Sequence, residues 1–387
     1  MAQKLPREII DLVVGEFQLD NRAEKRTIAQ CGLVCKSWFP SSRYRLFSDV
    51  NVDDHTITSF LDAVDNSLFA IPIVIRSLGL SFSGGENTVG LDESLRRLGP
   101  LPLVVALRLT MKDEILLRSL PLLRNTFSNI SALGFRTVPL HINSIFRTVS
   151  AFQSLKSLQL DWVSLSYADE KDGYHGLVLF SDDDGEDVDS DEEANEGKSY
   201  QLPPQWNSLA LDLLDNYWDS QKIFATILSL NPIPILSSLA VREIDPAADA
   251  PMGKYLARLG NALTYLRLES GPLKFFHHDI GGLKHCTGLR RLDLEFHCSS
   301  RIANTVLDVL QCLRCRNLVE VNIFDSSGGG HFTAIRGWEQ LDAKLAEEQF
   351  AQVQTFRVES KSLMLVSETP RCMPLSQARG ILQLSEA

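Results

Sequence analysis

The residues best suited to bind a metal lie close together in the last third of the sequence. Cys312 and Cys315 form a Cys-x-x-Cys pair, the spacing typical of one half of a structural zinc site. The remaining candidates nearby are His285, Cys286, His297 and Cys298. Their distance from the pair is loose, and Cys312 falls in a segment with helical apolar periodicity. We therefore expect buried structural cysteines here, and not a zinc site.

Three other chemical patterns are incomplete. Gly328-Gly329-Gly330 lacks the Lys-Ser/Thr that completes a phosphate-binding loop. His277 and His278 are adjacent and have no carboxylate at metal-site spacing. The sequence contains no Gly-x-Ser-x-Gly motif of a serine nucleophile. We predict a protein that is not an enzyme, with no catalytic residue, no cofactor and no metal.

The negative charge of the chain is concentrated in one segment. The 387 residues carry a net charge of −11, and the stretch from Ser181 to Glu196 holds ten acidic residues and no basic one. Without it the chain is nearly neutral and has no basic stripe, so we expect no nucleic-acid binding. The composition favours a disordered loop. Two roles remain open: phosphorylation of Ser181 and Ser190, or attraction of a basic partner.

The sequence favours a reducing compartment. No apolar run reaches the ~18 residues that a membrane span requires, and the first eight residues, MAQKLPRE, do not form a signal peptide. The seven cysteines are odd in number and irregularly spaced, which argues against a disulfide framework. We predict a cytoplasmic and/or nuclear protein with reduced thiols and no contact with a membrane.

A six-residue frame, apolar-x-x-apolar-x-apolar, recurs ten times. Its final residues are 25 to 35 positions apart, apart from one step of 51 that contains the acidic segment. The frames are Ile75/Leu78/Leu80, Val104/Leu107/Leu109, Ile130/Leu133/Phe135, Leu155/Leu158/Leu160, Trp206/Leu209/Leu211, Leu236/Leu239/Val241, Leu263/Leu266/Leu268, Leu289/Leu292/Leu294, Leu318/Val321/Ile323 and Val353/Phe356/Val358. Such a step is typical of leucine-rich repeats. The Asn or Cys that usually follows the strand is absent from most frames, so the repeats are irregular.

The frame predicts an α/β fold of strand–helix repeats. Its last three positions form a short strand whose apolar residues point into the core. Segments between frames have helical periodicity, for example 143–152, 305–313 and 338–350. We predict a small all-α module at 1–48, an irregular leucine-rich-repeat solenoid of about ten repeats at 49–360 with an acidic disordered insertion at about 168–200, and a tail at 361–387. Residues 362–366 could add a final strand before that tail.

Strand residues that alternate with the buried ones should line the concave face. They are mostly small in the earlier repeats, whereas the last four repeats carry aromatic and charged residues. Tyr, Arg and Phe often dominate binding energy at interfaces. We therefore predict a substrate-binding surface formed by Tyr265, Arg267, Arg291, Asp293, Asn322, Phe324 and Arg357. The alternative is a solvated face of salt bridges within the array.

The residues before the repeats predict a helical module. Pro6 suits the first position of a helix, and apolar residues at helical spacing follow it, at Ile9, Ile10, Val13, Val14 and Phe17. Two more segments, 27–38 and 39–47, complete it. A module of this size cannot bury so many apolar groups by itself.

The module resembles the F-box family. The motif pieces are Leu-Pro-x-Glu-Ile-Ile at 5–10, Cys-x-Leu-Val-Cys-Lys-x-Trp at 31–38 and Tyr-x-Leu-Phe at 44–47. The link between the first two pieces, 18–26, is a few residues longer than in many members. The combination with irregular repeats is similar to the large fungal F-box families.

The resemblance implies a subunit of an SCF-type cullin–RING ubiquitin ligase. It implies docking to a Skp-family adaptor, and through it to a cullin, while the repeats recruit an unknown protein substrate. By family analogy the adaptor-binding residues are Leu5, Pro6, Ile9, Ile10, Val34, Cys35 and Trp38. The alternative is a leucine-rich-repeat scaffold that holds a basic partner through its acidic loop and never joins a ligase.

Overall fold

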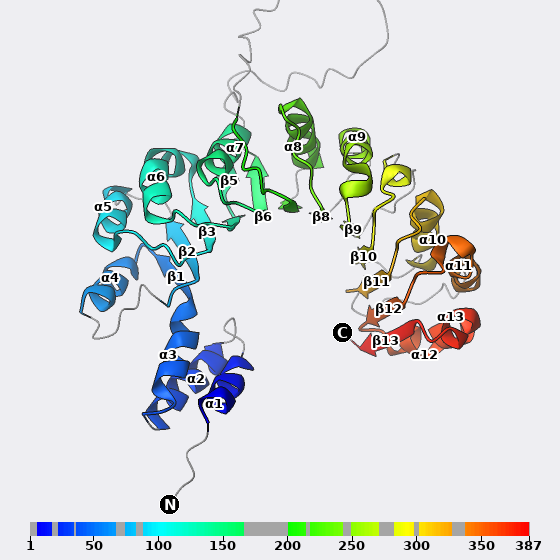
Figure 1. The fold of residues 1–387 in the computed structure, drawn as a ribbon, viewed down its shortest axis with the longest axis horizontal. Helices are drawn as coiled ribbons and strands as arrows, with labels where there is room; N and C mark the ends of the chain where they lie inside the picture. Colours follow the sequence, from blue (N-terminus) through cyan, green and yellow to red (C-terminus); the bar gives the residue numbers. More distant parts are fainter. Residues whose placement is uncertain are drawn as a thin grey trace, which may run out of the picture.

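The computed structural model describes residues 6–17, 22–34, 36–66, 74–82, 88–165, 200–213, 217–242, 249–270, 282–297, 302–326 and 337–386. The acidic segment, together with Leu5 and Cys35, lies outside these ranges. Two parts follow each other along the chain: a helical module and a curved α/β array (Figure 1).

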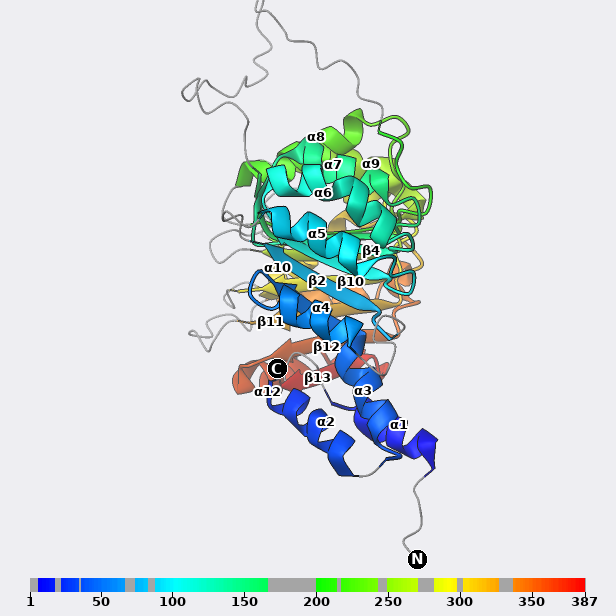
Figure 2. The same ribbon diagram turned by 90° about the vertical axis from the view of Figure 1, so that its left-hand side faces the viewer.

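The module consists of three helices. They are α1 (Arg7–Gly15), α2 (Arg22–Val34) and α3 (Phe39–Ser48). Pro6 precedes α1, and its carbonyl accepts hydrogen bonds from the amides of Ile9 and Ile10 at 3.1 and 3.2 Å. Proline fits there because the first turn needs no N–H from it. Figure 2 shows the module projecting from one end of the array, in line with α3.

A parallel sheet of 13 strands runs through the array, with strand order following the sequence except that β5 pairs only with β6. The strands are β1 (Asp49–Asp53), β2 (Ser77–Phe82), β3 (Ala106–Met111), β4 (Ala132–Arg136), β5 (Pro139–Leu140), β6 (Ser157–Leu165), β7 (Ser208–Leu213), β8 (Ser238–Val241), β9 (Tyr265–Ser270), β10 (Arg291–Phe296), β11 (Glu320–Asp325), β12 (Thr355–Ser360) and β13 (Leu382–Glu386).

Helices cover the outer side of the arc, and the strands line its inner side (Figure 1). The helices are α4 (Ile57–Asp65), α5 (Thr88–Leu98), α6 (Asp113–Thr126), α7 (Ile142–Ala151), α8 (Tyr217–Ser229), α9 (Asp249–Leu259), α10 (Ile302–Cys312), α11 (Trp338–Leu345), α12 (Leu363–Cys372) and α13 (Pro374–Ala378). A helix occupies more width than a strand, so placing all helices on one side bends the array.

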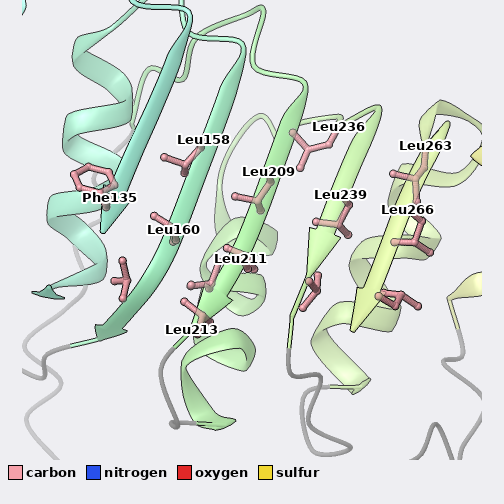
Figure 3. Close-up of a cluster of buried hydrophobic side chains, with 14 of the residues drawn as sticks. Phe135, Leu158, Leu160, Leu209, Leu211, Leu213, Leu236, Leu239, Leu263 and Leu266 are labelled. Atoms are coloured by element: carbon pink, nitrogen blue, oxygen red, sulfur yellow. The ribbon is translucent and has the colours of Figure 1, made fainter. Parts of the chain in front are cut away.

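The predicted apolar frame coincides with the strands. Its middle position forms a ladder in which each residue pairs with its equivalent in the next strand, and every member is at most 1% exposed. The ladder runs Leu78, Leu107, Leu133, Leu158, Leu209, Leu239, Leu266, Leu292, Val321 and Phe356. Figure 3 shows its central members packed towards the helices. The expected α/β fold of repeated strand–helix units is therefore confirmed.

The prediction of a loose tail at 361–387 is wrong. Residues 363–372 form α12 and not a strand, α13 follows, and β13 pairs with β12 in parallel. Leu365, Met373 and Ile381 are buried. A short apolar run such as 363–366 suits a strand or a buried helix equally, and packing against the previous unit decides in favour of the helix.

No described helix has both the length and the apolar character needed to cross a bilayer.

Candidate functional site

The helical module has a very small core of its own. Ile10, Val14 and Ile28 are fully buried, and Phe17, Trp38 and Leu46 pack around them. At Gly32 the helices α2 and α3 approach closely, since a Cβ there would lie 3.4 Å from that of Ser42. A core of this size leaves much of the apolar surface of three helices without cover.

Large apolar side chains are exposed on all three helices of the module, including Tyr44 on α3. Ile9, Leu12 and Val13 on α1 are at positions i, i+3 and i+4, so they share one face of the helix. At the end of α2, Leu33 and Val34 are 83% and 69% exposed. Exposed apolar groups gathered in this way are typical of an interface.

The predicted adaptor-binding residues divide into three groups. Pro6, Ile9 and Val34 are exposed, as a contact residue must be. Ile10 is buried and Trp38 packs on the module core, so the structure gives both a role in folding. Leu5 and Cys35 lie outside the described residues.

The sequence prediction missed Leu12, Val13 and Leu33. For Leu12 and Val13 helical periodicity contained the signal, because Ile10 and Val14 fill the inner face of α1 and leave these two on another face. In the sequence alone, Ile9 and Ile10 cannot be told apart by type. The handedness of the helix and the position of α3 decide which of the two is inside.

The module is joined to the array without a linker. Helix α3 ends at Ser48, and β1 begins at Asp49. Phe47 already packs against the core of the array, whereas Leu46 belongs to the core of the module. The orientation of the module is thus fixed by packing on both sides of this junction.

Aromatic and charged side chains gather on the concave side of β9 to β12. The strand register aligns Tyr265 with Arg291, and it aligns Arg267 with Asp293 and Asn322. A further row contains Glu269, Glu295 and Phe324. The alignment confirms that repeat-equivalent residues come together, although the repeats are 26 to 29 residues apart.

Asp293 is the centre of a hydrogen-bond network on this surface. It is 2% exposed and accepts hydrogen bonds from Tyr265 Oη at 2.9 Å, Arg291 Nε and Nη2 at 3.0 Å each, and Asn322 Nδ2 at 2.7 Å. Burial, together with the Asp293 carboxylate, raises the pKa of Tyr265 to about 12. Asp293 and Asn322 are therefore too buried to present their side chains to a partner, and they position their neighbours.

The arginines of this surface are held but accessible. The Arg291 guanidinium lies 5.4 Å from the Tyr265 ring centre, and its side chain is 47% exposed. Arg267 lies 5.7 Å from the Phe324 ring centre and forms an ion pair with Glu295. Cation–π contacts and bidentate pairing restrict the guanidinium groups and lower the entropy cost of using them in an interface.

Arg357 stands apart from this network. Its Nη2 donates to Gln383 Oε1 at 3.4 Å, and its side chain faces solvent. Four of the seven predicted residues thus share the Asp293 network, Arg267 and Phe324 form a neighbouring contact, and Arg357 lies one strand further on. The alternative, a solvated face of salt bridges within the array, is partly met as well, because ion pairs and exposed arginines occur on the same surface.

A histidine outside the predicted substrate-binding surface extends the network. His297, one residue after β10, has Nε2 2.6 Å from Glu269 Oε1 and Nδ1 2.6 Å from Ser326 Oγ. Burial raises the pKa of the Glu269 carboxyl, and the nearby Glu295 acts in the same direction, against the influence of His297 and Arg242. His297 lies outside the alternating frame positions, which explains why the pattern overlooks it.

The cysteines considered for zinc are part of the core. Cys286 and Cys315 are fully buried, and burial raises the pKa of their thiols to about 12 and about 11. Cys286 Sγ donates to the carbonyls of Gly282 and Leu256. Cys31 and Cys372 are also free thiols, Cys312 is partly buried against the same core, and Cys298 lies outside the described residues.

Neither a scan of protein-family models nor a search of curated protein sequences finds a match to this chain.

Proposed function

We propose that this protein is a substrate-recruiting subunit of an SCF-type cullin–RING ubiquitin ligase. In this proposal the helical module is an F-box that docks to a Skp-family adaptor, and the array is an irregular leucine-rich-repeat solenoid that binds the target. The protein would act in the cytoplasm, in the nucleus or in both. Catalysis would come from other subunits, and this chain would raise the effective concentration of the target.

The observation that carries the proposal is the exposed apolar surface of the module. Ile9, Leu12, Val13, Leu33 and Val34 lie within or beside the motif pieces that resemble the F-box. Solvent exposure of so many large apolar groups is costly unless a partner covers them. The rigid junction at Ser48–Asp49 also suits the role, because a recruiter must hold its target at a defined distance from the docking site.

The target surface proposed is the concave side of β9 to β12. Arg267, Arg291 and Arg357 offer exposed donors beside Tyr265 and Phe324. Arg and aromatic residues are frequent hot spots in interfaces. Charge reversal at Arg291 should weaken target recruitment without affecting adaptor binding, and unchanged recruitment would remove this surface from the proposal.

The test of the ligase role is co-purification of the full chain with a Skp-family adaptor. Leu12→Asp and Val34→Asp replace exposed residues, so they should leave the fold intact and weaken binding by more than about tenfold, the effect of removing a hot spot of roughly 2 kcal/mol. Trp38→Ala is a poorer choice because Trp38 packs on the module core. Ile235→Asp, at an exposed apolar residue of the array, is the matched control.

Absence of adaptor binding by the unmodified chain would contradict the ligase role. The alternative is then a leucine-rich-repeat scaffold that uses its acidic loop to hold a basic partner. Deletion of residues 182–196 distinguishes the two, because it should abolish capture of a basic protein by the scaffold and leave docking to an adaptor unchanged.

A further inference from the structure

Three side chains with metal-binding chemistry converge at the ends of β9 and β10. Glu269 comes from β9, Glu295 lies beside it on β10, and His297 follows β10. One ligand atom from each lies within 4.8 Å of the other two. Of the candidate zinc ligands in the sequence, His297 belongs to this cluster, and its partners here are two carboxylates and not the cysteines.

The cluster includes a buried carboxylate with incomplete bonding. The Glu269 side chain is only 7% exposed. Its Oε2 atom forms an ion pair with Arg242 Nε at 2.8 Å but has no hydrogen bond of good geometry. Arg242 thus offsets the negative charge at Oε2, whereas Oε1 faces His297 Nε2 at 2.6 Å.

The charges of the connected groups do not balance. Asp212, Glu269 and Glu295 bring three negative charges, and Arg242 and Arg267 bring two positive ones. With His297 neutral, one negative charge is left over. Arg242 contacts Oε2 of Glu269 and Arg267 contacts Oε2 of Glu295, whereas Oε1 of Glu269 faces His297.

The histidine has the second hydrogen bond that is usual for a metal ligand. Ser326 Oγ donates to the Phe296 carbonyl at 3.1 Å, and that carbonyl can only accept. When the hydroxyl donates to that carbonyl, His297 Nδ1, 2.6 Å from Ser326 Oγ, is the donor to the hydroxyl. In this tautomer a neutral His297 directs the lone pair of Nε2 towards Glu269 Oε1, and a metal ion or a proton can bridge the two atoms.

We propose that Glu269, Glu295 and His297 form a binding site for a divalent transition-metal ion, with one coordination position left open. Imidazole and carboxylate together suit Zn²⁺. Ligand atoms around Zn²⁺ stand roughly 3.3 Å apart in a tetrahedron, so His297 must move back by less than about 1 Å from its contact with Glu269. Its side chain is 34% exposed and has room to do so. The site is independent of the ligase role.

The arginines give the proposal a distinctive consequence. Arg267 holds Glu295 and competes with a metal for it. Removing this positive charge by Arg267→Ala should tighten metal binding several-fold, since repulsion falls and Glu295 is released. Removing ligands should do the opposite, so the two kinds of variant change affinity in opposite directions.

The experiment is calorimetric titration of Zn²⁺ into the full chain, without an affinity tag and freed of metal. One high-affinity ion per chain is expected. His297→Ala and Glu295→Gln should each weaken that binding by at least about tenfold, and Ser326→Ala by about tenfold through the lost support of His297. His55→Ala is the control, because His55 is an exposed histidine distant in the fold. Every variant keeps the acidic segment, so any Zn²⁺ bound there contributes equally to all titrations and cancels in the comparison.

Two results would overturn the metal site. One is Zn²⁺ binding that is unchanged in both His297→Ala and Glu295→Gln; a shared proton then explains the contact between Glu269 and His297. The other is weaker binding in Arg267→Ala. Should one ligand variant fail to fold, as judged by circular dichroism, the remaining variants decide. Adaptor binding is measured separately, so failure here leaves the ligase proposal untouched.

Discussion

Leu46 and Phe47 are adjacent in helix α3, yet they pack into different hydrophobic cores. Leu46 packs with Ile10, Val14 and Ile28 in the module, and Phe47 packs into the core of the array. Successive residues of a helix point about 100° apart, so one helix can serve two cores. The module and the array are therefore coupled through one turn of α3.

This pair gives the first prediction. Leu46→Ala should lower the stability of the module and leave the array unchanged, whereas Phe47→Ala should loosen the junction as well. Each removes a partly buried side chain, at a cost of about 1–3 kcal/mol. Hydrogen exchange is the measurement: Leu46→Ala should accelerate exchange in α1 and α2, and Phe47→Ala should accelerate exchange in β1 and β2. Identical exchange patterns in the two variants would contradict separate cores.

Asp342 ties the last unit to the one before it. It is 2% exposed in α11, and it accepts hydrogen bonds from the amides of Leu375 and Ser376 at 2.8 Å each and from Ser376 Oγ at 2.5 Å. Asp342→Ala should leave buried donors without partners, costing roughly 2–3 kcal/mol. Exchange or proteolysis within 374–386 should increase. Glu339→Ala, exposed on the same helix, should have no such effect.

Two glycines should respond in opposite ways to alanine. A Cβ at Gly288 would lie 1.9 Å from the Asn261 carbonyl oxygen, so Gly288→Ala must displace backbone, at a cost of about 1–3 kcal/mol. Gly90 lies inside α5 with nothing within 4 Å, so Gly90→Ala should stabilise the chain by about 0.5–1 kcal/mol. Urea denaturation of both variants checks the signs, and a Gly288→Ala variant as stable as the unmodified chain would contradict the close approach to Asn261.

The buried thiols should be unreactive in the native state. The pKa values of Cys286 and Cys315 are raised to about 12 and about 11, so neither forms thiolate at pH 8. For a raised pKa the folded state holds its proton longer than the unfolded state. The stability contribution is therefore complete below about pH 8.5 and decreases as pH rises towards these values. Mass spectrometry after alkylation at pH 8 should find both cysteines modified only after denaturation.

Much of the array could be predicted because its information is local and repeated. In each frame the alternation of apolar residues fixes which side of the strand is buried, and ten frames predict ten strands. Strands β1, β5 and β13 were not predicted: β1 lies immediately after α3, β5 has only two residues, and β13 lies in the supposed tail. Short single strands without a complete frame carry too little pattern to stand out.

By itself, the sequence determined the α/β class, the strand positions and the aligned rows of side chains, because a frame repeated along the chain needs no distant contact to be recognised. Only the tertiary structure decided that Ile10 is buried and Ile9 exposed, that residues 363–372 form a helix, and that His297 meets Glu269 and Ser326. The His297 contacts join residues 28 and 29 positions apart, and all three outcomes depend on strand register or helix packing. The type of a side chain limits what it can do, and its neighbours in space decide what it does.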